Sequence, residues 1–201
     1  MVKRHTILVT GSNGQLGTEF KELSAAYPQY EFIFPSKAEL SIDDFESVKQ
    51  FFHSSAPSFC INCAAYTAVD KAETDQEQAF LTNGEAVGVL ATLCKEFNTR
   101  FVHISTDYVF DGTATTPYTE DVATNPVNIY GASKLDGEVK AMENNTDAII
   151  IRTSWVYSPF GKNFVKTMLR LLSEKTEISV VNDQVGSPTY AADLQIQSCK
   201  S

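Results

Sequence analysis

ILVTGSNGQLGTEF, residues 7–20, places three glycines between a short apolar run and a helical pattern. Gly11, Gly14 and Gly17 follow one another at three-residue spacing. Glycine in this setting permits a tight turn and lets the backbone approach a pyrophosphate, while the helix N-terminus offers amide donors and a positive dipole. The stretch therefore predicts a strand, a phosphate-binding turn and a helix, the first unit of a dinucleotide-binding fold.

The rest of the chain continues this alternation of strand and helix. Apolar runs predict strands at residues 5–10, 30–35, 58–64, 100–106, 147–157 and 177–182. Helical spacing predicts helices at residues 16–27, 43–54, 71–98, 127–143 and 162–174. Strands that are apolar nearly throughout and alternate with helices predict an α/β fold with a doubly wound parallel sheet of the Rossmann type. We expect an NAD(P)-binding domain at 1–175 and the beginning of a substrate-binding lobe at 176–201.

Composition excludes several classes of partner. The 201 residues carry a formal charge of -9 and contain no run of Lys and Arg, so binding to nucleic acid or to an anionic membrane surface is not expected. No apolar stretch is long enough to span a bilayer, and the N-terminus does not read as a signal peptide, so we expect a cytoplasmic protein.

Cysteines and histidines give no pattern of a metal site. The cysteines lie at positions 60, 63, 94 and 199, and the histidines at positions 5, 53 and 103. Neither set has ligand spacing, so we expect free buried cysteines, solvated or core histidines, and no metal.

The end of the second strand bears on the choice of cofactor. An acidic residue there would bind a ribose 2′-hydroxyl and repel a 2′-phosphate. Phe34, Pro35, Ser36 and Lys37 stand in that place, so NADPH is at least as plausible as NADH. Lys37 either contacts the phosphate or is a solvated loop charge.

Tyr130 and Lys134 lie four residues apart in a predicted helix and so share a face. A nearby ammonium stabilises phenolate, so we expect Lys134 to lower the pKa of Tyr130 and make it a proton donor and acceptor. Ser105 and Thr106 end the fourth strand and offer hydroxyls to a substrate carbonyl. The polar segment 110–126 that follows predicts an active-site loop.

The glycine turn, the Ser/Thr pair and Tyr-x-x-x-Lys together resemble the extended short-chain dehydrogenase/reductase superfamily. Within it, STDYVFDG, YGASKLDGE, RTSWVY and VVNDQVGSPTYAADL resemble the dTDP-4-dehydrorhamnose reductase family, and the similarity runs from about Ile7 to Leu194. The resemblance implies an oxidoreductase of polysaccharide biosynthesis that uses NADPH or NADH to reduce the C4 keto group of a dTDP-sugar, dTDP-4-dehydro-L-rhamnose. It also allows a homodimer.

The resemblance also implies roles for individual residues. Thr106 would hold the C4 oxygen, Tyr130 would protonate it, and Lys134 would hold the ribose. Cofactor binding would involve the catalytic pair Tyr130 and Lys134 together with Gly11, Asn13, Gly14, Gln15, Leu16, Gly17, Ser41, Ile42, Asn62, Ala64, Ala65 and Tyr66. Substrate binding would involve Thr106 together with Val69, Asp107, Tyr108 and Trp155. As an alternative, Tyr108 and Trp155 are core aromatics.

Two departures from the family accompany these roles. Ser41 stands where the family has an aspartate that reads the adenine, so this task would pass to Ser41, the Ile42 backbone or Asp43. Family members also continue well beyond this length, so we expect these 201 residues alone to bind NADPH but to reduce dTDP-4-dehydro-L-rhamnose very slowly or not at all, unless another chain completes the site. Two alternative functions remain, a catalytically silent NAD(P)-binding regulatory protein and a nucleotide-sugar epimerase.

Overall fold

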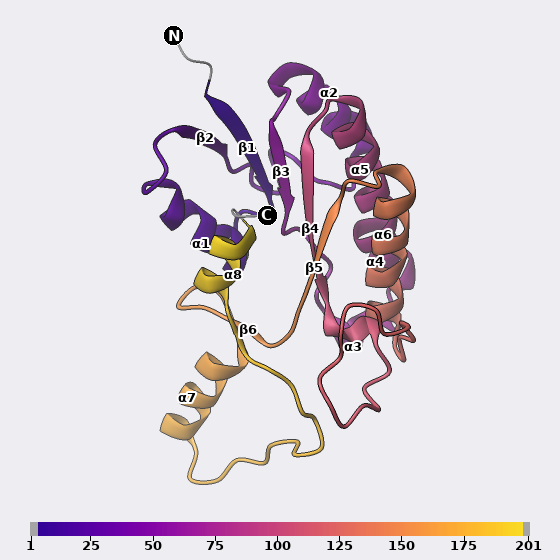
Figure 1. Ribbon diagram of the computed structural model, residues 1–201. Helices are drawn as coiled ribbons and strands as arrows, with labels where there is room; N and C mark the ends of the chain where they lie inside the picture. Colours follow the sequence, from indigo (N-terminus) through magenta and orange to yellow (C-terminus); the bar gives the residue numbers. More distant parts are fainter. Residues whose placement is uncertain (1–3, 199–201) are drawn as a thin grey trace.

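The computed structural model describes residues 4–198, and side chains as far as residue 195. Its centre is a five-stranded parallel sheet of order β2-β1-β3-β4-β5 (Figure 1). The strands are β1 His5–Thr10, β2 Tyr30–Ile33, β3 Phe59–Asn62, β4 Arg100–Thr106 and β5 Ile149–Thr153. A separate two-stranded sheet joins β6 Val156–Tyr157 to β7 Thr189–Tyr190.

Helices cover both faces of the large sheet (Figure 1). One face carries α1 Gln15–Ser24 and α8 Ala191–Ser198, and the other carries α2 Phe45–Ser55, α5 Ala86–Glu96 and α6 Ile129–Asn144. Right-handed crossovers explain this split, because the chain moves one way from β1 to β2 and the opposite way from β2 onward. The predicted doubly wound fold is confirmed.

Each face of the sheet has its own core. Alternate residues of β1 point to opposite faces, so Val9 joins Phe20 on the α1 side while Leu8 joins Phe52 and Leu90 on the other. All five of these side chains are completely buried. A strand that is apolar on both faces is therefore what the two-sided helical cover requires.

The helix expected at 71–98 is instead four pieces. These are α3 Val69–Ala72, α4 Gln76–Phe80, a π-helical turn η1 Leu81–Glu85, and α5. Asn83 in η1 donates to the carbonyl oxygen of Tyr66 at 3.0 Å and accepts from its N–H at 2.8 Å. A π turn inserts one residue and redirects a side chain. The interruption thus fastens the loop that follows β3, a tertiary role that helical spacing does not reveal.

Two expected strands differ from the structure. The strand at 147–157 stops after Thr153, because Trp155 adopts a φ of 49° and turns the chain away from the sheet into β6. The run at 177–182 forms no strand, and Val180 and Val181 are exposed. An apolar run becomes a strand only where a neighbouring edge is available, and here β7 supplies the partner of β6.

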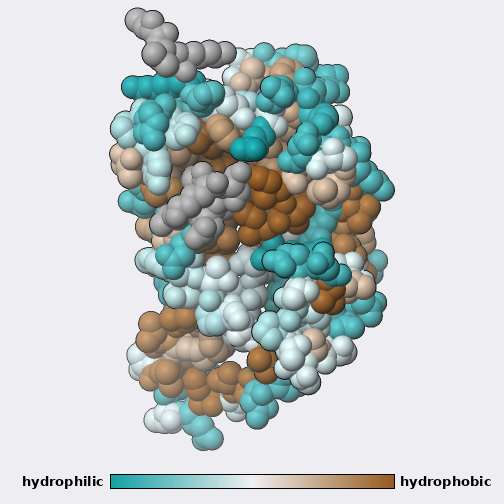
Figure 2. Space-filling model, viewed as in Figure 1, coloured by the Kyte–Doolittle hydropathy of each residue, from teal (hydrophilic) through white to brown (hydrophobic). Residues whose placement is uncertain are grey.

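The helices α7 and α8 differ in how they pack against the rest of the protein. α7 Phe164–Glu174 buries no residue, and Figure 2 shows brown apolar side chains gathered at the lower left, over this helix. In contrast, α8 packs on α1, and Ala191 and Leu194 belong to the core of that face. The domain division near residue 175 stays a prediction. Within the described part of the chain, no helix is long and apolar enough to cross a membrane.

Candidate active site

The glycine turn lies against the loop that follows β3. Gly11 has a φ of 65°, and a Cβ on it would lie 2.6 Å from the backbone nitrogen of Ala64. A Cβ on Gly17 would lie 2.6 Å from the Cα of Ser12. Gly14, the N-cap of α1, has more room, since its nearest neighbour would be the Gly11 carbonyl oxygen at 3.2 Å. The turn can thus form only with glycine at the first and third positions, while Gly14 is less tightly enclosed.

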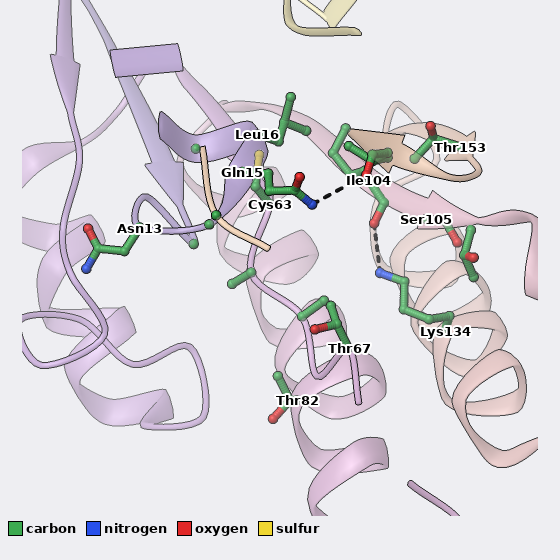
Figure 3. A pocket seen from close by; sticks show the side chains of 18 of the residues that line it. Asn13, Gln15, Leu16, Cys63, Thr67, Thr82, Ile104, Ser105, Lys134 and Thr153 are labelled. Atoms are coloured by element: carbon green, nitrogen blue, oxygen red, sulfur yellow. Dashed lines mark hydrogen bonds between the residues drawn. The ribbon is translucent and has the colours of Figure 1, made fainter. Parts of the chain in front are cut away.

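This turn opens into a cavity of about 630 Å³ at the carboxyl ends of the strands (Figure 3). It lies where the crossover direction reverses between β1 and β3, the usual ligand position of doubly wound sheets. The predicted site residues that line it are Gly11, Asn13, Gly14, Gln15, Leu16, Gly17, Ser41, Ile42, Ala64, Ala65, Val69, Thr106, Asp107, Tyr108, Tyr130, Lys134 and Trp155. Residues from six separate segments therefore line one cavity.

Two residues predicted to contact the cofactor do not line the cavity. Asn62 is completely buried beneath the floor, where its amide bonds Thr10 and His103. The hydroxyl of Tyr66 turns away and donates to Asp75 at 3.1 Å. Burial and this carboxylate raise the pKa of Tyr66.

The end of β4 brings three polar groups together. Thr106 caps the 3₁₀ turn η2 Asp107–Val109 by accepting from the Tyr108 N–H at 3.3 Å, and it donates to the Asp107 carboxylate at 3.1 Å. Partial burial raises the pKa of Asp107. The Tyr108 ring stands edge-on to the Tyr130 ring at 5.5 Å. Because Tyr108 and Trp155 are 37% and 40% exposed, neither is a core aromatic.

Tyr130 and Lys134 share one face of α6, as their spacing predicted. The expectation that Lys134 lowers the pKa of Tyr130 is wrong. Burial raises the pKa of Tyr130 to about 12, against the opposing effect of its hydrogen bond with Thr106. Nζ of Lys134 donates instead to the carbonyl oxygen of Ile104 at 2.7 Å, and Figure 3 shows this bond. Burial lowers the pKa of Lys134 to about 8. In this structure burial, and not an adjacent ammonium, sets the protonation of the phenol.

Ser105 lines the cavity, but its hydroxyl is hydrogen-bonded within the protein. It donates to Glu138 at 2.5 Å, and Glu138 also binds Arg152 through bonds of 2.7 to 3.1 Å. This buried pair joins β4, β5 and α6 beneath the site. Glu138 follows Lys134 by four residues on the same helix face, so helical spacing could have identified it.

Sequence reasoning also missed His103, which it treated as an ordinary core or surface histidine. The side chain is completely buried, and its Nε2 lies 3.2 Å from Nζ of Lys134. Its only signal is its place in the strand, two residues before Ser105 and on the opposite face from Val102. Nothing in the spacing of the three histidines connects it to Lys134.

One end of the cavity is formed by the segment that follows β2. Ser41 and Lys37 both line it, and Nζ of Lys37 lies 3.8 Å from Asp43. The Lys37 side chain is 79% exposed, so it is free to turn toward a ligand. No cluster of three metal-binding side chains occurs within residues 4–198.

Comparison with known proteins identifies relatives over nearly the whole chain. The family model described as RmlD substrate binding domain matches residues 5–198. A dTDP-4-dehydrorhamnose reductase of Burkholderia thailandensis is 47% identical over 188 residues, which are 94% of this chain and 62% of that protein. The spore coat polysaccharide biosynthesis protein SpsK of Bacillus subtilis is 46% identical over 94% of this chain and 66% of its own.

A solved structure gives the same relationship. The dTDP-4-dehydrorhamnose reductase of Bacillus anthracis, crystallised in complex with NADP, has a TM-score of 0.95 and is 41% identical, and the match covers all of this chain and 71% of that one. The chain thus spans a little under two thirds of the length of the curated relatives named above. With its glycine turn, its cavity and a match over residues 5–198, the chain belongs to the RmlD substrate binding domain family.

Proposed function

We propose that the protein reduces the C4 keto group of dTDP-4-dehydro-L-rhamnose to dTDP-L-rhamnose with NADPH or NADH. The observation that carries the proposal is that Thr106, Tyr130 and Lys134 line the same cavity as the glycine turn. A hydroxyl, a phenol and an amine beside a dinucleotide cradle are suited to placing a proton on a carbonyl oxygen. The names of relatives such as the Burkholderia reductase support the choice of substrate.

The glycine turn fits a dinucleotide. A Cβ at Gly11 or Gly17 would collide with backbone, whereas Gly14, the N-cap of α1, is less tightly enclosed and lines the cavity. The positive end of a helix beside backbone that can be approached closely suits a pyrophosphate. The bound cofactor supplies the hydride. NADP in the Bacillus anthracis relative favours a nicotinamide cofactor here as well.

The roles of the catalytic side chains follow from their protonation. Because burial holds the pKa of Tyr130 at about 12, its phenol is protonated at neutral pH and can donate to the substrate C4 oxygen. Thr106, which lines the same cavity, would hold the same oxygen. Lys134 lies one helical turn deeper and would reach the cofactor ribose while its Nζ is held by the Ile104 carbonyl.

The same cavity would also hold the sugar nucleotide. Its lining includes Val69, Asp107, Tyr108 and Trp155, and the two exposed rings offer apolar faces to a sugar or base. We further propose a cytoplasmic location, a homodimer, and the division into 1–175 and 176–201, none of which the site itself requires.

Single-turnover chemistry tests the function. Protein in excess is mixed with NADPH and dTDP-4-dehydro-L-rhamnose, NADPH absorbance is followed, and the sugar product is identified by mass spectrometry. Loss of NADPH with formation of dTDP-L-rhamnose, absent in Tyr130→Phe, is the expected result. Tight NADPH binding without any product would favour the silent regulatory alternative, and epimerised sugar without net NADPH loss would favour the epimerase.

A further inference from the structure

A row of buried polar side chains crosses the sheet beneath the cavity. Thr10 on β1 is in register with Asn62 on β3, and Asn62 is in register with His103 on β4. Residues in register on neighbouring strands lie on the same face, and here they are hydrogen-bonded in sequence and end at Lys134 of α6. None of the four is more than 2% exposed. Polar groups buried this completely are costly unless their hydrogen bonds are well matched.

The backbone fixes the orientation of Asn62. The Ala64 N–H, which can only donate, points at Oδ1 of Asn62 at 3.2 Å, and the Thr10 hydroxyl donates to the same oxygen at 2.5 Å. The amide Nδ2 must then face His103, where it lies 3.0 Å from Nδ1. A flipped amide would set its NH₂ group against the Ala64 N–H.

The orientation of Asn62 in turn fixes the tautomer of His103. Because Nδ2 of Asn62 is a donor, Nδ1 of His103 must accept, and the single proton of a neutral imidazole then resides on Nε2. Burial and the nearby Lys134 both lower the pKa of His103, so the ring is neutral. The Nε2–H therefore points at Nζ of Lys134, 3.2 Å away.

We propose that His103 is a positioning residue for Lys134: its fixed Nε2–H is a donor that favours the uncharged amine of Lys134 over the ammonium. An amine can accept this N–H and still donate to the Ile104 carbonyl, whereas an ammonium would set two donors against each other. The row thus connects the glycine turn, through Thr10, to the charge of the lysine. The relevance for catalysis rests on the proposed function, but the effect on Lys134 does not.

Other groups around Lys134 act in the opposite direction. Glu138 on α6 and Cys63 after β3 both favour the ammonium. Glu138 is already neutralised by Arg152 and Ser105, and burial raises the pKa of the Cys63 thiol, which keeps it uncharged. His103 is thus the hydrogen-bonding side chain in direct contact with Nζ that opposes the charge.

Two NMR measurements on the chain without ligand test the proposal. In histidine-labelled protein, long-range ¹H–¹⁵N correlations report the tautomer, and the His103 signals are those missing from His103→Phe. We expect the neutral Nε2–H form over the whole pH range in which the protein is folded. The Nδ1–H form, or a His103 ring that becomes protonated within this pH range, would overturn the proposal.

The second measurement follows Lys134 itself. In lysine-labelled protein the ¹³Cε shift gives its titration midpoint, assigned by its loss in Lys134→Met. His103→Phe keeps the ring volume but removes the N–H, so the midpoint should rise by about one pH unit, the shift that one ordinary hydrogen bond produces. Phe101→Leu is the matched control, because Phe101 stacks on His103 on the same strand and face but offers no hydrogen bond.

A variant of Asn62 tests whether the Lys134 midpoint depends on the tautomer of His103 or only on the packing of its ring. Asn62→Leu leaves His103 free to place its proton on Nδ1, so the Lys134 midpoint should rise in this variant too, but not further when combined with His103→Phe. An unchanged midpoint in both single variants, or additive shifts in the double variant, would overturn the proposal. Because no cofactor or substrate is present, either result is independent of the reductase assignment.

Discussion

Glu138, which is buried, and Arg152, which is partly buried, form a two-pronged ion pair, with Arg152 Nη2 2.7 Å from Glu138 Oε2 and Arg152 Nε 3.1 Å from each carboxylate oxygen. Glu138 is only 4% exposed and also accepts from Ser105. The pair therefore fixes α6, which carries the tyrosine and the lysine, onto the strand ends that complete the cavity.

Removing Glu138 should strongly destabilise the protein. Glu138→Ala leaves Arg152 partly buried without its partner, and losses of about 3 kcal/mol in the free energy of unfolding are typical of such a change. Urea denaturation measures the loss. Glu143→Ala, an exposed position on the same helix, is the control and should change the free energy by less than about 0.5 kcal/mol. Equal effects of the two substitutions would contradict a structural role of the ion pair.

The glycines of the turn should separate folding from cofactor binding. At Gly14 a Cβ would lie 3.2 Å from the Gly11 carbonyl oxygen, a milder contact than the one at Gly17, and the residue lines the cavity, so Gly14→Val should fold and lose the thermal shift that NADPH produces. At Gly17 a Cβ collides with Ser12, so Gly17→Ala should lower the melting temperature before any ligand is added. A normal NADPH shift in Gly14→Val would mean that the pyrophosphate lies elsewhere.

Tyr130→Phe should lower single-turnover reduction by at least about a hundredfold while NADPH binding is nearly unchanged, because general acid catalysis is lost. The pKa of about 12 adds a pH prediction. The acid form of Tyr130 persists through neutral and mildly alkaline pH, so ionisation of this group should not reduce the rate there. A loss of rate that follows phenol ionisation near pH 8 would show that the tyrosine is less buried than in this structure.

The buried ammonium of Lys134 should lower the free energy of unfolding at neutral pH. Its pKa is near 8 in the folded protein against 10.5 when exposed, so the folded state binds fewer protons and the cost is present in full below pH 8. The cost disappears as pH rises from about 8 to about 10.5. The stability of Lys134→Met relative to the unsubstituted protein should therefore fall across this window, by up to about 3 kcal/mol. Lys49→Met, at an exposed position of α2, is the control for the exchange of a lysine for a methionine.

Lys37 should decide between the two nicotinamide cofactors. If its exposed ammonium turns from Asp43 to a 2′-phosphate, Lys37→Ala should weaken NADPH binding about fivefold, as expected for a solvent-exposed ion pair, and leave NADH binding unchanged. Titration calorimetry with both cofactors measures the ratio. An equal loss for the two would assign Lys37 a role in the loop and not in recognition.

Much of this architecture was determined by the sequence alone. The glycine spacing after β1, the apolar strands and the Tyr130–Lys134 spacing are local patterns, and each dictates its own element because backbone geometry and burial act over a few residues. The order of strands and helices then allowed only a few arrangements of the strands in the sheet, since the crossovers between parallel strands are right-handed. Most predicted site residues consequently lie on one cavity.

What the tertiary structure decided depends on contacts between distant segments. Asn83 in the π turn accepts a hydrogen bond from the Tyr66 N–H, and Trp155 turns the chain away from the sheet at the end of β5. Neither feature has a local sequence signal. Likewise, burial raises the pKa of Tyr130, and His103 meets Lys134 only because β4 and α6 pack together. Hydrogen bonding and desolvation are properties of the assembled interior, so the protonation of the site could be derived only from the fold.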